Sequence, residues 1–273
     1  MIQKKVIKVF WIFIPLVLIA FIFFVIRKPS NNRDWEVDQS ILPEVEIENN
    51  LVHIKNIRDF DYKTETNYIK NYYDRTFDLD KIKSIDFGLS IFSKWKGLAH
   101  TFLSFGFEDG EYVAVSIEIR KEKNETYSAL RGLLNEYEIM YVVADEGDVI
   151  KLRTNIRDEK VYLYPVKTTK EKQQELFLNI MEQVKRLEIE PEFYNTATNA
   201  CGTGIMSHVN EISERRIPID FRVLIPGYSD ELGYKLGLFD TELSLEEAQK
   251  KFYISDKAKK FVKGQNFSRM IRE

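Results

Sequence analysis

The chain has 273 residues, with 40 basic and 43 acidic side chains, and hydrophobic residues make up 44% of it. Positions 1–28 hold five basic residues and no acidic one, which leaves 35 basic and 43 acidic side chains in the remainder. Phosphate neutralisation needs clustered Lys and Arg, so this mildly acidic remainder excludes nucleic acid as the expected partner. Its length is enough for one sizeable hydrophobic core.

The first predicted element is a membrane anchor. Residues 9–26 form an uninterrupted apolar run, close to the ~20 residues that span a bilayer. Three lysines precede the run while only Arg27 and Lys28 follow it, which favours a cytoplasmic N-terminus. No small-residue cleavage site follows the run, as a signal peptide would require. We therefore predict an uncleaved single-pass anchor in the cell membrane, residues 1–28, and an extracytoplasmic catalytic domain, residues 29–273.

Beyond the anchor, strands are predicted first and a helix later. Residues 51–57 and 114–119 alternate apolar and polar side chains, the period-two pattern of half-buried strands. Residues 136–143 and 160–164 are further predicted strands. Residues 167–187 carry apolar side chains at helical spacing. Strands followed by helices indicate the α+β class rather than a wound α/β sheet.

A β-hairpin is predicted around His100, and it gives this histidine a carboxylate partner. Residues 99–107 and 111–120 are separated by a three-residue loop that ends in Gly110, which can adopt the left-handed conformation that such loops need. In this register His100 lies opposite Glu118, with Cβ atoms about 4.5 to 5.5 Å apart. We therefore expect Glu118 to hydrogen-bond to His100 and orient it.

Cys201 is the only cysteine of the chain. A lone thiol outside the cytoplasm has no disulfide partner, so it is either buried and inert or kept for its nucleophilicity. Threonine and asparagine residues precede it, and residues 205–212 can form a helix, which would place the thiol at a helix N-terminus. The helix dipole and the free amides there lower a thiol pKa and can bind an oxyanion. We interpret Cys201 as a nucleophile, His100 as its base and Glu118 as the third catalytic residue.

The remaining candidate residues have structural alternatives. A lone cysteine is most often a small buried hydrophobe. His208 lies about 10.5 Å along the helix axis from Cys201 and is predicted to be a structural or a surface residue. Three histidines and one cysteine show no metal-ligand spacing, so neither a metal nor another cofactor is expected. Arg120, on the same strand face as Glu118, is a candidate for binding a lipid phosphate, with a surface ion pair as the alternative. Asn199 is a further candidate for substrate binding.

Several ordered motifs resemble the Lnb N-terminal periplasmic domain family. They lie at residues 56–62, 100–107, 116–120, 137–143, 194–201, 219–230 and 236–240. The resemblance implies bacterial lipoprotein N-acylation, in which a fatty acyl group moves from a membrane phospholipid to the α-amino group of a lipoprotein's N-terminal cysteine. Family catalysis by a Cys and a His would map onto Cys201 and His100. The sequence shows no C-terminal group of membrane helices like that of better known members, so the acceptor stays open.

A second resemblance concerns the architecture. The order of histidine, carboxylate and then cysteine at a helix start is similar to that of circularly permuted papain-like enzymes of the NlpC/P60 superfamily. This resemblance implies an antiparallel sheet packed on helices, preceded here by the single transmembrane helix.

The predicted function is that of a cysteine-dependent acyltransferase that works through a thioester on Cys201. Membrane phospholipid is the expected acyl donor and a bacterial lipoprotein the expected acceptor. Two alternatives remain. A papain-like cell-wall peptidase or amidase would use the same residues with water as acceptor, and a non-catalytic, membrane-tethered binding module would bury Cys201 away from His100. An apolar site favours lipid, whereas a polar open groove favours peptide.

Overall fold

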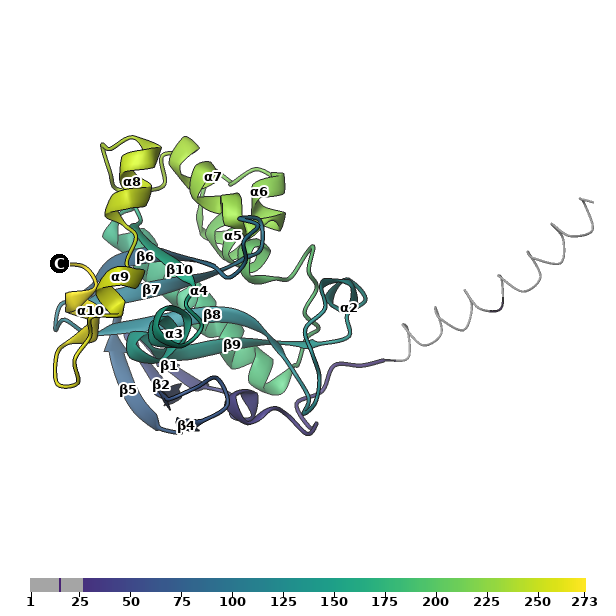
Figure 1. Ribbon diagram of the computed structural model, residues 1–273. Coiled ribbons are helices and arrows are strands. Elements are labelled where there is room, and N and C mark those ends of the chain that lie inside the picture. The colour runs from purple at the N-terminus through teal and green to yellow at the C-terminus, as the bar shows by residue number, and fades with distance from the viewer. Residues whose placement is uncertain (1–14, 16–26) are drawn as a thin grey trace, which may run out of the picture.

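The computed structural model describes Pro15 and residues 27–273 (Figure 1). The strands are β1 (Glu44–Glu48), β2 (Leu51–Arg58), β3 (Asp61–Tyr62), β4 (Tyr68–Ile69), β5 (Tyr72–Asp78), β6 (Ile82–Ile91), β7 (Ala99–Phe107), β8 (Tyr112–Arg120), β9 (Glu138–Asp145) and β10 (Lys160–Pro165). The helices are α2 (Ala129–Leu133), α3 (Glu146–Lys151), α4 (Lys170–Ile189), α5 (Cys201–Ile212), α6 (Phe221–Leu224), α7 (Ser229–Lys235), α8 (Leu245–Lys251), α9 (Ser255–Ala258) and α10 (Phe267–Met270). Single turns are η1 (Val37–Gln39), η2 (Leu79–Lys81), η3 (Leu152–Ile156) and η4 (Pro226–Tyr228).

One large sheet organises the domain. It has eight strands, in the order β1-β2-β9-β8-β7-β6-β10, and β5 also pairs with β2. Neighbouring strands are antiparallel except β2 and β9, whose single pairing, Arg58 with Ala144, is parallel. The predicted α+β class is confirmed, the five predicted strands are present as β2, β7, β8, β9 and β10, and the predicted helix is α4. Strands β1, β5 and β6 are not predicted from the sequence pattern.

The predicted hairpin is formed by β7 and β8. Gly110 has φ +83°, and its amide donates to the Phe107 carbonyl oxygen at 3.0 Å, which closes the three-residue loop. The ladder runs from Gly106↔Tyr112 to Phe102↔Ser116 in the predicted register. It ends there, so His100 and Glu118 lie beyond the last paired residues. The two strands separate at this end, and this separation creates the candidate site described below.

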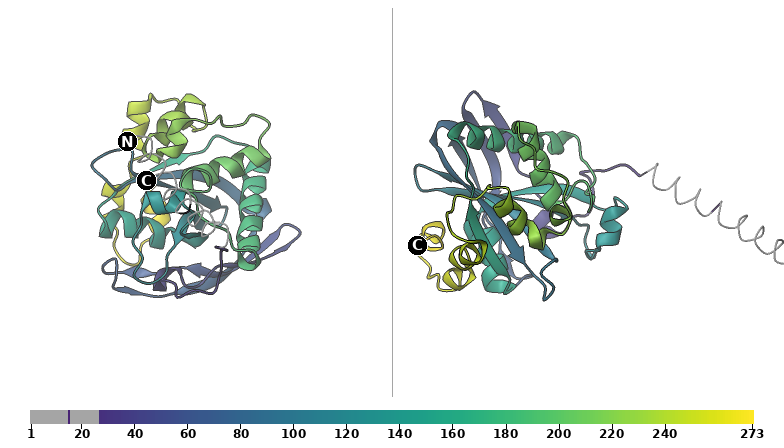
Figure 2. Two further views of the ribbon diagram at one scale, coloured as in Figure 1. Left: turned by 90° about the vertical axis from the view of Figure 1, so that its right-hand side faces the viewer. Right: turned by 90° about the horizontal axis from the view of Figure 1, so that it is seen from above.

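Helices cover both faces of the sheet (Figure 2). The first face carries Leu103, Phe105 and Ile117, and α4 and α5 pack on it through side chains such as Phe177 and Ile205. The second face packs against α3, α9 and α10. Its core residues are Phe102, Ala114, Met140, Val142, Val149, Ile150, Ile254 and Phe267. His100 lies two residues before Phe102 on β7, so strand alternation places both side chains on the second face. Thr101, between them, lies on the first face.

The N-terminal end of the described domain lies beside α2 (Figure 1). Arg27 donates to the Glu136 carbonyl oxygen at 2.6 Å, and its guanidinium lies 5.7 Å from the centre of the Phe193 ring. The predicted anchor at residues 9–26 falls on positions outside the described residues, Pro15 apart. From residue 27 onward, the structure contains no helix that is both long and apolar enough to cross a membrane.

Candidate active site

A cavity of about 340 Å³ opens where β7 and β8 separate. We call it the thiol cavity. Ala99 and His100 of β7 line it together with Ile117, Glu118 and Ile119 of β8. Consecutive residues of a strand point to opposite faces of a sheet, so a cavity lined by consecutive residues passes between the strands and is reached from both faces. The same cavity is lined by Phe92, Tyr127, Arg153, Arg157, Glu159, Tyr194 and Cys201.

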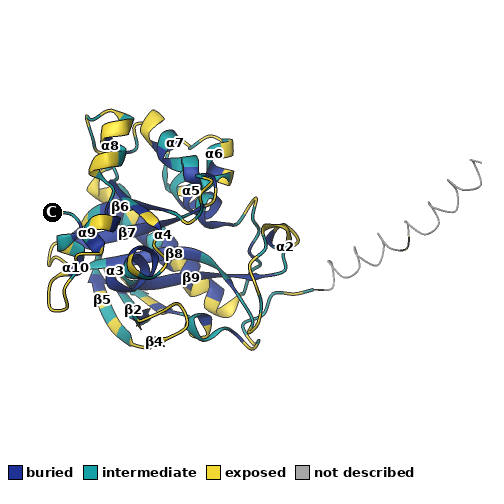
Figure 3. Cartoon of the chain, in the orientation of Figure 1, coloured by how far each residue is buried: buried dark blue, intermediate teal, exposed yellow. Residues whose placement is uncertain are grey.

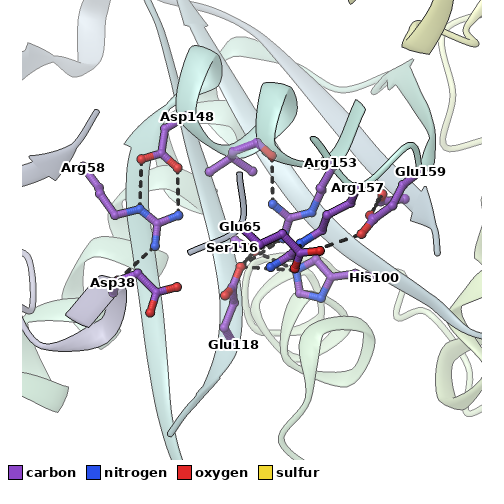
Figure 4. Close-up of polar contacts among 12 residues, drawn as sticks. Asp38, Arg58, Glu65, His100, Ser116, Glu118, Asp148, Arg153, Arg157 and Glu159 are labelled. Carbon is purple, nitrogen blue, oxygen red and sulfur yellow. Dashed lines mark hydrogen bonds and ion pairs between the residues drawn. The ribbon is translucent and has the colours of Figure 1, made fainter. Parts of the chain in front are cut away.

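His100 is connected to Glu118 through a serine (Figure 4). Nε2 of His100 lies 2.6 Å from Oγ of Ser116, and this hydroxyl donates to Oε1 of Glu118 at 2.8 Å. The His100 and Glu118 side chains themselves approach only to 3.9 Å. The expected direct hydrogen bond is therefore wrong, because the ladder ends before it reaches these two residues.

The hydrogen-bond chain fixes which nitrogen of His100 is the base. Ser116 has one hydroxyl proton, which it donates to Glu118, so Nε2 of His100 must be the donor to Ser116. Nδ1 is then left with a free lone pair. A neutral imidazole held in this tautomer can accept a proton on Nδ1 while Glu118 compensates the charge through Ser116.

Arg153 completes this polar cluster. Its Nη2 donates to Glu118 Oε1 at 3.0 Å, and its Nη1 donates to the Val149 carbonyl oxygen at 2.9 Å. Burial would raise the pKa of Glu118, but the Arg153 guanidinium and neighbouring positive charges outweigh it and lower that pKa. Burial, reinforced by Arg153, lowers the pKa of His100 from 6.5 to about 3. At neutral pH the pair is therefore a carboxylate and a neutral imidazole.

Cys201 is the first residue of α5, as predicted. Its side chain is buried, with the residue 7% exposed, and it reaches the thiol cavity from the first face, opposite to His100. Burial raises the pKa of the thiol, and the neighbouring polar groups of Thr101 and Gly202 only partly oppose this rise. The expected lowering of the thiol pKa is therefore wrong, because desolvation at this buried helix terminus outweighs the dipole.

The thiol and the imidazole share the cavity without a direct bond. Among the residues that the structure describes, Cys201 and His100 form no hydrogen bond with each other, and both are neutral at pH 7. The arrangement is thus a neutral thiol and a neutral base on opposite sides of one cavity. Catalytic hydrogen bonds often tighten only when substrate binds.

The two predicted substrate-binding residues lie outside the thiol cavity. Arg120 is buried against the N-terminal segment, where its nitrogens donate to Gln39, Asn31 and Ser40 at 2.9 to 3.0 Å. Its guanidinium also covers the Trp35 ring at 4.3 Å. A phosphate has no access to this group, so both the phosphate role and the surface ion pair are wrong.

Asn199 also has a structural position. Its side-chain amide donates to the Phe193 carbonyl oxygen at 3.2 Å, and its backbone amide donates to the Asn195 carbonyl oxygen at 2.9 Å. These bonds hold the turn that precedes α5. Asn199 therefore positions the cysteine's helix rather than a substrate.

Three polar residues near His100 are not predicted from the sequence: Ser116, Arg153 and Arg157. Ser116 has a usable signal, because it lies two residues before Glu118 and therefore on the same strand face. Arg153 lies in η3 and Arg157 directly follows it, about 35 residues after Glu118 in the chain, and no spacing in the sequence relates them to His100. They enter the site through the packing of α3 and η3 on the second face.

The other histidines have structural partners. His208 is buried, with Nε2 2.7 Å from the Tyr141 hydroxyl and Nδ1 2.6 Å from Oδ1 of Asn179. Its predicted structural role is confirmed. His53 lies 2.6 Å from the Thr76 hydroxyl, on the other side of the sheet centre from the thiol cavity. No group of three or more His, Cys, Asp and Glu residues in the described ranges has the geometry of a metal site.

Comparison with known proteins supports one family. The sequence matches the model of the Lnb N-terminal periplasmic domain over residues 68–227, which is more than half of the chain and includes His100, Ser116, Glu118, Arg153 and Cys201. Searches of curated proteins and of solved structures find no match. The family's periplasmic character indicates an extracytoplasmic domain. The chain belongs to the Lnb N-terminal periplasmic domain family.

Proposed function

We propose that this protein is a membrane-anchored thiol acyltransferase with a papain-like catalytic arrangement. It would move a fatty acyl group from a phospholipid to the α-amine of a bacterial lipoprotein's N-terminal cysteine. The observation that carries this proposal is the shared cavity of Cys201 and His100, with Ser116 and Glu118 fixing the imidazole tautomer. The non-catalytic alternative predicts Cys201 buried away from His100, whereas both residues line the same cavity.

The proposed reaction begins from neutral groups. Sγ of Cys201 attacks the ester carbonyl of the phospholipid while its proton passes to Nδ1 of His100. Free amides at the start of α5 stabilise the oxyanion. The C–O ester bond then breaks, and His100 returns the proton to the departing alkoxide, which leaves as a lysophospholipid.

The second half of the reaction regenerates the enzyme. The acceptor amine attacks the thioester, His100 removes the proton of the amine, and the C–S bond breaks. The thiolate recovers that proton from His100, which restores the neutral pair. A resting thiol with a raised pKa suits this scheme, because the proton is transferred during the attack and not before it.

Exposed apolar side chains around the cavity support a lipid substrate over a cell-wall peptide. We call the following residues the apolar rim: Phe92, Trp95 and Leu98 between β6 and β7, Tyr127, Leu130, Leu133 and Leu134 around α2, and Ile219, Phe221 and Leu224 around α6. They are ten of the sixteen large apolar side chains that are exposed in the described chain, so they are concentrated here. Figure 3 shows α2 and α6 exposed on the side of the domain where the described chain begins. Concentrated exposed apolar surface marks contact with a protein or a membrane.

The experiment that tests the function measures lipoprotein acylation. Wild type, Cys201→Ser, His100→Gln and His53→Gln would be expressed in cells that lack their own lipoprotein N-acyltransferase, and the N-terminus of one lipoprotein would be analysed by mass spectrometry. We expect an added acyl chain with wild type and with His53→Gln, the control histidine, and loss of at least about 100-fold with the other two. An unacylated lipoprotein in all four, with folded protein present, would contradict the proposal.

A further inference from the structure

A second cavity, of about 120 Å³, lies on the other side of Cys201 from the polar cluster. We call it the apolar cavity. It lies between the first face of the sheet and helices α5, α6 and α7, with Leu103, Ile205, Val223 and Leu232 among its walls. Of its described lining residues, Thr101 and Ser229 alone carry a polar side-chain atom. Such a wall offers almost nothing to a peptide backbone or a headgroup.

The apolar cavity begins at the atoms that surround the thiol. Gly202, which follows Cys201 in the chain, lines it, and so does Thr101. Thr101 is fully buried and lies close enough to the thiol to lower its pKa, while its hydroxyl makes no hydrogen bond of ordinary geometry to another described residue. The thiol is therefore held between a polar cavity that contains His100 and an apolar cavity that starts at Thr101.

We propose that the apolar cavity receives the hydrocarbon chain of an acyl group attached to Cys201. This inference rests on the proposed function and names the part of the substrate that the site recognises. Each CH₂ group of a hydrocarbon chain is stabilised when it leaves water, so a chain enters such a cavity whereas a polar peptide side chain does not. In this proposal the Thr101 hydroxyl, which has no hydrogen-bond partner among the described residues, donates to the thioester carbonyl at the mouth of the cavity.

One face of α5 forms a wall along the length of the apolar cavity. Gly202, Ile205, Met206 and Val209 line it, at the i, i+3, i+4 and i+7 spacing that defines one helix face. At 1.5 Å per residue, Val209 lies about 12 Å along the axis from Cys201. A larger side chain at position 209 therefore shortens the far end of the cavity and leaves its mouth beside the thiol unchanged.

Alkyl methanethiosulfonates test this inference without any acyl transfer. The Cys201 thiolate attacks the sulfenyl sulfur of the reagent, forms a mixed disulfide with the alkyl thio group and expels methanesulfinate, and Cys201 is the only possible target. The full chain in nanodiscs would be modified with the methyl, hexyl or decyl reagent, and thermal unfolding would follow. The variants are Val209→Trp and, as a matched control, Ser207→Trp, because Ser207 is exposed on the same helix.

Wild type and Ser207→Trp should melt several degrees higher with the decyl than with the methyl group. Val209→Trp should lose this increment for decyl but not for hexyl. If Val209→Trp does not fold, Val209→Phe replaces it. The inference would be overturned if the rise in melting temperature did not depend on the length of the alkyl chain. It would also be overturned if Val209→Trp kept the full rise with the decyl group. Failure of the lipoprotein assay alone would leave this result standing, so the two proposals fail separately.

Discussion

Cys201 is unusual among candidate nucleophiles because its helix terminus faces the protein interior. The dipole and free amides of a helix start usually lower a thiol pKa, but here burial dominates and raises it. Glu118 adds to the rise, since its negative charge disfavours a nearby thiolate. The thiol therefore depends on a base during the reaction, and its own reactivity toward small reagents should be low at neutral pH.

The rate at which iodoacetamide alkylates Cys201 tests this view. We expect the rate to keep rising above pH 9.0, the ordinary thiol value. Glu118→Gln should move the midpoint to lower pH, because it removes a negative charge and leaves Arg153 without its partner. Mass spectrometry of the intact protein gives the rate, since the chain has no other cysteine. A midpoint near neutral pH in wild type would show that the thiol is activated at rest.

His100 should make stability depend on pH. Its pKa falls from 6.5 to about 3 on folding, so between these values the unfolded chain binds more protons than the folded one. The contribution of neutral His100 to the free energy of unfolding is therefore fully present above pH 6.5. It decreases as the pH falls, by about 1.4 kcal/mol per pH unit at most. Urea unfolding from pH 7 to pH 4 should show a steeper loss for wild type than for His100→Gln. Equal slopes would mean that folding does not lower the pKa of His100.

At the scale of single elements, the β7–β8 hairpin shows which structural features can be predicted from the sequence and which cannot. Its strands, its Gly110 turn and its register follow from local rules, because turn length fixes which residues face each other. The end of the ladder does not follow from these rules. The ladder ends at a cavity that is lined by Arg153 from the second face and by Cys201 of α5 from the first, and no local rule brings these distant segments together.

The two misplaced binding residues illustrate the same limit. Alternation puts Arg120 on the same strand face as Glu118, but the sequence does not reveal that residues 31–40 cover that part of the strand. Asn199 precedes the cysteine's helix, as the sequence shows, but the turn there uses its hydrogen bonds. Position along an element was thus predictable, whereas contacts between distant segments were not.

The close approach of α5 and α6 makes Gly202 sensitive to substitution. A Cβ atom at Gly202 would lie 2.5 Å from the Val223 carbonyl oxygen, a backbone atom that cannot rotate away. We expect Gly202→Ala to destabilise the fold by about 1–3 kcal/mol. Gly204→Ala is the matched control in the same helix, because its Cβ would meet the flexible end of the Ile117 side chain. Chemical denaturation should therefore show a clearly smaller loss for Gly204→Ala.

At the scale of the whole molecule, the apolar rim and the beginning of the described chain lie on the same side. Arg27 contacts Glu136 and Phe193 beside α2, and Figure 1 shows the chain approaching the domain there. Phe92 and Tyr127 belong both to the rim and to the thiol cavity. If residues 9–26 span the bilayer as predicted, the rim would rest on the lipid surface and the cavity mouth would face its donor.

Tryptophan quenching by brominated phospholipid measures this orientation directly. The variant Trp11→Phe removes the tryptophan of the predicted anchor and leaves Trp95, which is 53% exposed on the rim, and Trp35, which is 6% exposed in the interior. With the full chain in vesicles whose bromines lie close to the headgroups, part of the emission should be quenched. The additional substitution Trp95→Phe should abolish that quenching, because Trp35 stays shielded by the domain.

Rim substitutions separate contact with lipid from simple proximity to the anchor. Leu130→Asp together with Phe221→Asp should reduce the quenching of Trp95, since exposed apolar side chains are what hold the rim at the interface. A tethered domain that tumbles freely above the bilayer would show weak quenching in every variant, and that outcome would contradict the proposed orientation. Strong quenching that the two aspartates relieve would place the mouth of the thiol cavity at the membrane surface, where a phospholipid ester can reach Cys201.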